Sequence, residues 1–182
     1  MKSLSSFGKI SLNNFQFKEC PKQINKSREY ILSGVDKNII TKTDSRSWTG
    51  TICEYELDKS IEEHKWKIKL LNVKYNHFMV GVAPIDFDIN SSVYNNCGWY
   101  LYCYDSKLYS GPPFNYNGKG TNLSKVNDEI IVVMNMKKRT LKFIINNEDK
   151  GDAYTDIPID KPLFPAILLD NLNDSVEISE FE

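Results

Sequence analysis

Two histidines and four cysteines are the side chains of this sequence best suited to nucleophilic or metal chemistry, and their spacing favours neither. A serine or cysteine nucleophile needs a base within hydrogen-bond reach, and His64 and His77 are the only histidines. Each flanks a predicted strand, so we interpret both as strand-edge or loop residues. No two cysteines have the C-x-x-C spacing of a zinc site; they are Cys20, Cys53, Cys97 and Cys103. The sequence therefore predicts no catalytic residue, no metal ligand and no cofactor.

A short acidic run is similar to the start of a calcium-binding loop. Asp86, Asp88 and Asn90 match the first three ligands of such a loop. Ser91 stands where the loop needs a glycine to bend, and Cys97 stands where it needs a bidentate glutamate. A solvated loop is therefore the better interpretation of this run.

Three alternating tyrosines, Tyr100, Tyr102 and Tyr104, share one face of a predicted strand. Such a face can stack bases of single-stranded RNA, but aromatic residues also suit an ordinary half-buried sheet. We favour the half-buried sheet. The formal charge of −1 lacks the basic excess of most nucleic-acid binders, so no nucleic-acid partner is predicted.

Apolar residues at two-residue spacing recur along most of the sequence, with turn signals between them. From Lys65 to Leu71, apolar and lysine residues alternate strictly, which is typical of a strand with one buried face. From Phe78 to Ala83 the run is continuously apolar, as in a strand covered on both faces. Predicted strands occupy residues 30–33, 38–42, 48–55, 65–71, 78–83, 98–104, 108–109, 129–135, 140–145, 151–154, 163–169 and 175–179, and Phe15 and Phe17 can form one more.

The connections give weaker signals than the strands. Residues 57–63 are acidic and can form one helical turn, residues 111–120 hold several prolines and glycines and are expected to be irregular, and residues 146–150 are expected to turn. We expect all three tryptophans in the core: Trp48, Trp66 and Trp99.

The length of 182 residues suits one sizeable domain. We predict a polar lead-in or linker over residues 1–29 and one domain over residues 30–182. The N-terminus has no apolar signal region, and the longest apolar runs are too short to cross a bilayer. We therefore expect reduced cysteines, a cytoplasmic location, no membrane contact and a monomeric domain.

A set of short motifs stands in a fixed order between residues 64 and 180. They are Trp66, Val80-Gly81-Val82-Ala83, Gly98-Trp99, Asp105-Ser106-Lys107-Leu108-Tyr109, Asn127-Asp128, Thr140-Leu141-Lys142-Phe143, Gly151 and Leu163-Phe164-Pro165-Ala166. As an ordered set they resemble the SPRY domain. Asn127 replaces the glycine of the usual Gly-Asp turn, which still permits a left-handed conformation.

The resemblance implies an all-β fold, a bent sandwich of two antiparallel sheets of the jelly-roll or concanavalin type. It also implies a non-catalytic module that binds a protein or peptide through loops at one end. Members of the family often serve as the substrate-recognition part of a ubiquitin ligase or as a scaffold in signalling.

The family places partner contacts in the lead-in loop, in the loop after the Val-Gly-Val-Ala strand and in the loop before the last strand. By position these are residues 43–47, 90–96 and 170–173. We expect Tyr94 to be the aromatic anchor and Arg46 to pair with an acidic or carbonyl group. The predicted partner-binding residues are Thr43, Asp44, Arg46, Tyr75, Tyr94, Asn95, Asp170, Asn171 and Leu172.

The alternative hypothesis is a carbohydrate-binding, lectin-like sandwich, because lectins share this general architecture. Asp86, Asp88, Tyr94 and Asn95 would then line a calcium-assisted sugar site.

Overall fold

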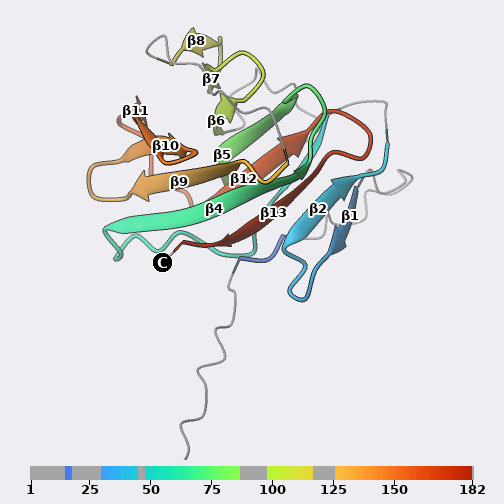
Figure 1. Cartoon of the computed structure of the whole chain (residues 1–182). Helices are drawn as coiled ribbons and strands as arrows, with labels where there is room; N and C mark the ends of the chain where they lie inside the picture. The colour runs from blue at the N-terminus through green and yellow to red at the C-terminus, as the bar shows by residue number, and fades with distance from the viewer. Residues whose placement is uncertain (1–14, 18–29, 45–47, 87–97, 117–125, 182) are drawn as a thin grey trace, which may run out of the picture.

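The chain folds into two antiparallel β-sheets packed face to face (Figure 1). This computed structural model describes residues 15–17, 30–44, 48–86, 98–116 and 126–181. The strands are β1 (Tyr30–Ser33), β2 (Ile39–Lys42), β3 (Thr49–Ile52), β4 (Glu63–Asn72), β5 (Phe78–Pro84), β6 (Trp99–Tyr102), β7 (Lys107–Tyr109), β8 (Phe114–Asn115), β9 (Glu129–Asn135), β10 (Thr140–Ile145), β11 (Glu148–Tyr154), β12 (Leu163–Leu169) and β13 (Ser175–Glu180). The predicted all-β sandwich is confirmed.

Strand order shows that the sheets are built from long-range pairings. The seven-stranded sheet has the order β1-β2-β13-β4-β9-β10-β11, and the six-stranded sheet has the order β3-β12-β5-β6-β7-β8. Thus β13 lies between β2 and β4 in Figure 1, although it follows them by more than a hundred residues in sequence. Every pair of neighbouring strands is antiparallel.

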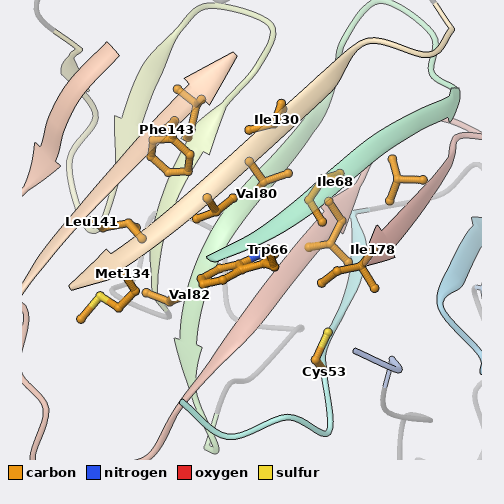
Figure 2. Close-up of a cluster of buried hydrophobic side chains, with 14 of the residues drawn as sticks. Cys53, Trp66, Ile68, Val80, Val82, Ile130, Met134, Leu141, Phe143 and Ile178 are labelled. Carbon is orange, nitrogen blue, oxygen red and sulfur yellow. The ribbon is translucent and has the colours of Figure 1, made fainter. Parts of the chain in front are cut away.

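The main core lies between the two sheets. In β4, Trp66, Ile68 and Leu70 point inward and are fully buried, as their alternation with lysines predicts. Figure 2 shows Trp66 and Ile68 among side chains of β5, β9, β10 and β13. Lys67, on the other face of β4, forms an ion pair with Glu129 across to β9 at 3.1 Å. One face of β4 is therefore apolar and buried, and the other face carries charged side chains.

In the six-stranded sheet, β5 and β12 are buried on both faces, as the continuous apolar run in β5 predicts. Val80 and Val82 belong to the main core, whereas Met79 and Ala83 belong to a second buried cluster on the opposite face. Gly81 is the point of closest approach to β6, because a Cβ atom there would collide with the carbonyl oxygen of Trp99. The two strands can lie together only with glycine at this position.

Residues 15–17 and β11 tie the sandwich together. Phe15 and Phe17 are buried in the main core, and Phe17 forms a β-bridge with Cys53. The hydroxyl of Tyr154 in the seven-stranded sheet donates a hydrogen bond of 2.7 Å to the carbonyl oxygen of Tyr100 in the six-stranded sheet. The segment before residue 30 thus contributes to the core.

Residues 57–62 hold a single turn, in which the backbone N–H of Ile61 donates to the carbonyl oxygen of Asp58 at 3.1 Å, before β4 begins at Glu63. Two local expectations were wrong. The stretch expected to be irregular contains β8. The expected turn after β10 is only two residues long, and β11 begins at Glu148. Among the described residues, no helix is long and apolar enough to cross a membrane.

The aromatic residues are buried less uniformly than their spacing predicts. Trp66 is fully buried, whereas Trp48 and Trp99 are only partly so. The tyrosine face also divides, because β6 ends at Tyr102: Tyr100 is fully buried in the second cluster, while Tyr104 lies in the following turn and is 59% exposed.

Candidate functional site

Four connections meet at one end of the sandwich, which we call the loop end. They are residues 43–48, 73–77, 103–106 and 170–174, of which all but 45–47 are described. The register requires this meeting: Leu169 lies opposite both Phe78 and Thr49, and the end of β6 lies opposite the start of β5. The arrowheads of β2 and β12 point toward this end in Figure 1.

A buried aspartate connects two of these loops with the end of β2. Asp174 is 1% exposed, and it accepts hydrogen bonds from the backbone N–H of Lys74 at 2.7 Å and from the side-chain amide of Asn171 at 3.1 Å. Its backbone carbonyl accepts a hydrogen bond from the N–H of Lys42 at 2.9 Å. Burial raises the pKa of the Asp174 carboxyl in spite of these donors.

The hydrogen bonds of Asp174 hold a tight turn that contains Tyr75. Tyr75 and Asn76 both have left-handed backbones, with φ of 57° and 56°. This conformation is unfavourable for a tyrosine. The side-chain amide of Asn171 also donates to the carbonyl of Lys74, at 2.7 Å, which fixes the residue before the turn. The Tyr75 ring is 66% exposed, and the ammonium group of Lys74 lies 5.0 Å from its centre.

Tyr75 is the outermost member of a continuous row of rings, which we call the ring row: Trp48, Tyr102, His77, Tyr104 and Tyr75. His77 stacks on Tyr104 with ring centres 4.2 Å apart and planes 17° apart. Tyr102 lies 5.9 Å from the His77 ring and 5.6 Å from Trp48, and the Tyr75 ring lies 6.4 Å from His77. All five side chains are at least partly exposed.

Hydrogen bonds fix the inner part of the ring row. The Nδ1 atom of His77 is hydrogen-bonded to the hydroxyl of Tyr102, and the backbone N–H of Asp170 donates to the carbonyl of His77 at 3.1 Å. The positions of these rings are therefore set by three neighbouring strands of the six-stranded sheet, β5, β6 and β12.

The structure brings six predicted site residues together at the loop end: Thr43, Asp44, Tyr75, Asp170, Asn171 and Leu172. Arg46, Tyr94 and Asn95 lie outside the described residues. The connection that carries Tyr94 and Asn95 leaves β5 after Pro84 and enters β6 at Trp99. The strand register places Pro84 and Trp99 at the end of the sheet that lies opposite the loop end. Tyr75 is therefore the exposed tyrosine that the structure places beside Asp170 and Asn171.

The sequence did not single out Trp48, His77, Tyr102 and Tyr104 as neighbours in a site. Trp48, His77 and Tyr104 lie in three separate connections and Tyr102 lies at the end of β6, so local spacing relates only Tyr102 to Tyr104. One usable signal was Asp105, which starts the turn after β6 through a hydrogen bond from the N–H of Lys107 at 3.1 Å. A strand that ends before this turn leaves Tyr104 outside the sheet.

The other residues considered for chemistry have structural surroundings. His64 lies inside β4, 4% exposed, and its ring nitrogens are hydrogen-bonded to the Tyr55 hydroxyl at 3.1 Å and to the Asp58 carbonyl at 2.9 Å. Asp86 accepts a hydrogen bond of 2.6 Å from Lys161, which lowers the pKa of its carboxyl. Within the described ranges, no three His, Cys, Asp or Glu residues are grouped to hold a metal ion.

Cys53 and Cys103 are buried thiols that form no disulfide with another described cysteine. Burial raises the pKa of each well above its usual value, which disfavours the thiolate that a nucleophile needs.

Comparison with known proteins identifies the family. The SPRY domain model matches residues 63–180. No curated protein matches the chain at a significant level. Among solved structures, the SPRY domain of human HERC1 superposes with a TM-score of 0.70 at 17% identity, covering 84% of this chain and 93% of that one.

Two further structures show the same fold. A human SPRY domain gives a TM-score of 0.66 at 14% identity, with 84% of this chain and 95% of that one covered. The TRIM65 PSpry domain gives 0.65 at 14% identity, with 93% and 92% covered. With the match of the family model over most of the chain, these results establish that the chain belongs to the SPRY domain family.

Proposed function

We propose that this chain is a protein-binding module that receives a peptide or a protein surface at the loop end. SPRY domains are generally non-catalytic protein-interaction modules. The observation that carries the proposal is the ring row, five contacting and partly exposed rings on one surface. Soluble proteins seldom expose a contiguous aromatic patch unless it meets another molecule.

Tyr75 is the anchor of the proposed site. Tyrosine is enriched among the few interface residues that carry most of the binding free energy. Residues in unfavourable backbone conformations persist only where their surroundings fix them, and such residues cluster at functional sites. The hydrogen bonds of Asp174 and Asn171 fix this turn before a partner arrives, which reduces the entropy lost on binding. Leu172, 48% exposed in the adjoining loop, extends the contact surface.

We further propose that binding brings the partner to a ubiquitin ligase or a signalling assembly in the cytoplasm. The membership of the SPRY family supports the first part of this proposal. The free thiols of Cys53 and Cys103 support a reducing compartment.

The substitution Tyr75→Asn tests the site, because asparagine tolerates the left-handed conformation but removes the ring. Peptides selected by the wild-type chain from a random phage-displayed library should bind Tyr75→Asn at least about tenfold more weakly. The free energy of unfolding should stay unchanged or rise by up to about 1 kcal/mol. Binding is measured by fluorescence anisotropy and stability by urea denaturation.

Ile61→Asn is the matched control. Ile61 is exposed like Tyr75, but it lies in the connection between β3 and β4 at the opposite end of the sandwich. The control should bind the selected peptides as the wild type does. If Tyr75→Asn also binds them normally, the loop end is not the binding site.

A further inference from the structure

We infer that the loop end binds an arginine side chain of the partner, an inference that rests on the function proposed above. The guanidinium group pairs with the carboxylate of Asp170 and lies against the aromatic rings on either side of it. The place of Asp170 in the ring row, the positions of the other charges and the electrostatics of the rings lead to this ligand.

Asp170 lies between two members of the ring row, Trp48 and His77. Strand β12 lies between β3 and β5, and its last residue, Leu169, is paired with the first residue of each. Asp170 comes next, so its neighbours are the residues that precede those two strands, Trp48 and His77. The backbone N–H of Asp170 donates to the carbonyl of His77 at 3.1 Å, which confirms the pairing. Side chains at such opposite positions have Cβ atoms about 5 Å apart.

Asp170 also shares a face of the sheet with the rings. Leu169 is buried in the main core, and successive side chains of a strand point to opposite faces. Asp170 is therefore directed to the face that holds the second buried cluster, against which Trp48 and Tyr102 pack. Its side chain is partly exposed, so the carboxylate is open to a ligand that lies beside the rings.

The charge of Asp170 is not neutralised by another described residue. Within the described ranges, its carboxylate makes no hydrogen bond and no ion pair. Burial raises the pKa of the nearby Asp174 carboxyl, and the negative charge of Asp170 raises it further. A cation bound at Asp170 relieves this repulsion, so the loop end favours a positively charged ligand.

Three lysines around the loop end are held in other contacts. The ammonium group of Lys74 lies 5.0 Å from the centre of the Tyr75 ring. Lys107 forms an ion pair with Asp105 at 3.1 Å, and Lys42, at the end of β2, is fully buried. The contact of Lys74 also shows that a ring of this row can hold a cation.

Arginine is the side chain that fits these groups best. Its guanidinium group is planar, stacks on aromatic rings and donates two parallel hydrogen bonds to a carboxylate. Tryptophan is the strongest aromatic partner of a cation within about 6 Å, and Trp48 stands beside Asp170. An ammonium group has the same charge, but it is a strongly hydrated point charge with no face to stack. The rings keep water from part of the ion pair, which strengthens the attraction.

The experiment is a nuclear magnetic resonance titration of the whole ¹⁵N-labelled chain with the peptide acetyl-GSRSG-amide. The matched probe carries citrulline in place of arginine, which keeps the shape and removes the charge. The arginine peptide should give saturable shifts at the Trp48 indole and at residues 75–77 and 170–172. The citrulline peptide should bind at least about tenfold more weakly. A peptide with lysine in the same place should bind more weakly than the arginine peptide, because it cannot stack.

Asp170→Asn removes the charge of the carboxylate and keeps its shape. This variant should bind the arginine peptide at least about tenfold more weakly than the wild type, and it should no longer distinguish arginine from citrulline. Its free energy of unfolding should stay unchanged or rise, because the repulsion of Asp174 is removed. Asp160→Asn, which alters an exposed carboxylate at the opposite end, is the matched control and should bind as the wild type does.

Equal binding of the arginine and citrulline peptides, no binding of the arginine peptide, shifts centred on another surface, or normal binding by Asp170→Asn would overturn the inference. So would binding that appears only in Arg46→Ala, because the chain's own arginine would then fill the site.

The phage selection separates this failure from failure of the proposed function. Selected peptides that depend on Tyr75 but are not enriched in arginine would leave the loop end as the binding site and reject the ligand class. Selected peptides that do not depend on Tyr75 would reject both.

Discussion

The carboxylate of Asp174 accepts hydrogen bonds from two different loops while it is almost fully buried. A buried carboxylate is costly unless donors surround it, and here the donors are the groups that shape the loop end. The residue that organises the site is therefore not one that a partner would touch. The exposed position of Tyr75 is therefore determined by the residues that surround its turn.

Replacement of Asp174 should reveal this arrangement in a pH profile. Asp174→Ala leaves the N–H of Lys74 without its acceptor, so we expect a loss of about 2 kcal/mol in the free energy of unfolding at neutral pH. The folded pKa of Asp174 is raised, so the folded state holds this proton more tightly than the unfolded state. Its contribution to stability is full below the unfolded pKa of about 4 and falls as pH rises through the folded pKa.

The difference between the wild type and Asp174→Ala should accordingly widen as pH is lowered from about 7 toward about 4. Urea denaturation across this range measures it. Asp160→Ala, an exposed carboxylate at the opposite end, is the control and should show no such trend. A difference that narrows on acidification would contradict the assignment.

Part of the loop end could be predicted from the sequence at this scale. Tyr75 was predicted because this tyrosine stands in a polar connection without alternation, and the structure shows it to be exposed. Asp174 was not predicted, because nothing in the order Asn173-Asp174-Ser175 shows that the carboxylate points inward. Burial of a short polar side chain depends on which loops pack beside it, and that information is not local.

At the scale of the element, β5 and β6 show how one glycine sets a strand pair. The close approach of Gly81 to the carbonyl of Trp99 leaves no room for a side chain. In the same pair of strands, β5 begins directly after the turn that carries His77, and β6 ends at Tyr102, two residues before Tyr104. The spacing of these strands therefore also determines the spacing of the ring row.

We expect Gly81→Ala to lower the free energy of unfolding by about 3 kcal/mol or more, because the added methyl group must push two backbones apart. Gly151→Ala is the comparison. Its Cβ would meet nothing within 4 Å, but φ is +79°, so the cost is the backbone conformation alone, about 1 kcal/mol. Thermal and urea denaturation of both variants measure the effect. Equal losses would show that β6 can move away from β5 freely.

Periodicity predicted the elements well and their ends poorly. The alternation of β4 and the continuous run of β5 were confirmed, because two-residue spacing directly reports burial on one face or both. The end of β6 at Tyr102 was not anticipated. It depends on a local turn, in which the N–H of Ser106 donates to the carbonyl oxygen of Tyr102 at 3.0 Å.

At the scale of the whole molecule, β13 completes the seven-stranded sheet. Ser175 lies opposite both Thr41 of β2 and Asn72 of β4. Val176 and Ile178 of this strand are almost fully buried in the main core. Neither the sheet order nor this insertion follows from periodicity, since alternation shows that a strand exists but not which strand it joins.

We expect a chain shortened to end at Asp174 to be unfolded. Loss of Val176 and Ile178 alone removes about 2 to 5 kcal/mol each, and the strand that joins β2 to β4 is lost. A chain that ends at Glu180 retains β13 and is the control. Circular dichroism and proton chemical-shift dispersion distinguish the two. A native spectrum from the chain ending at Asp174 would show that β2 and β4 can be joined in another way.

The central place of β13 also bears on biosynthesis. Translation delivers β1 and β2 early, but they cannot dock until the ribosome has made residues 175–180 and these have emerged from the exit tunnel. From the synthesis of β1 until residues 175–180 emerge, a nascent chain must therefore carry exposed strand edges, the kind of surface that chaperones shield in unfinished sheets.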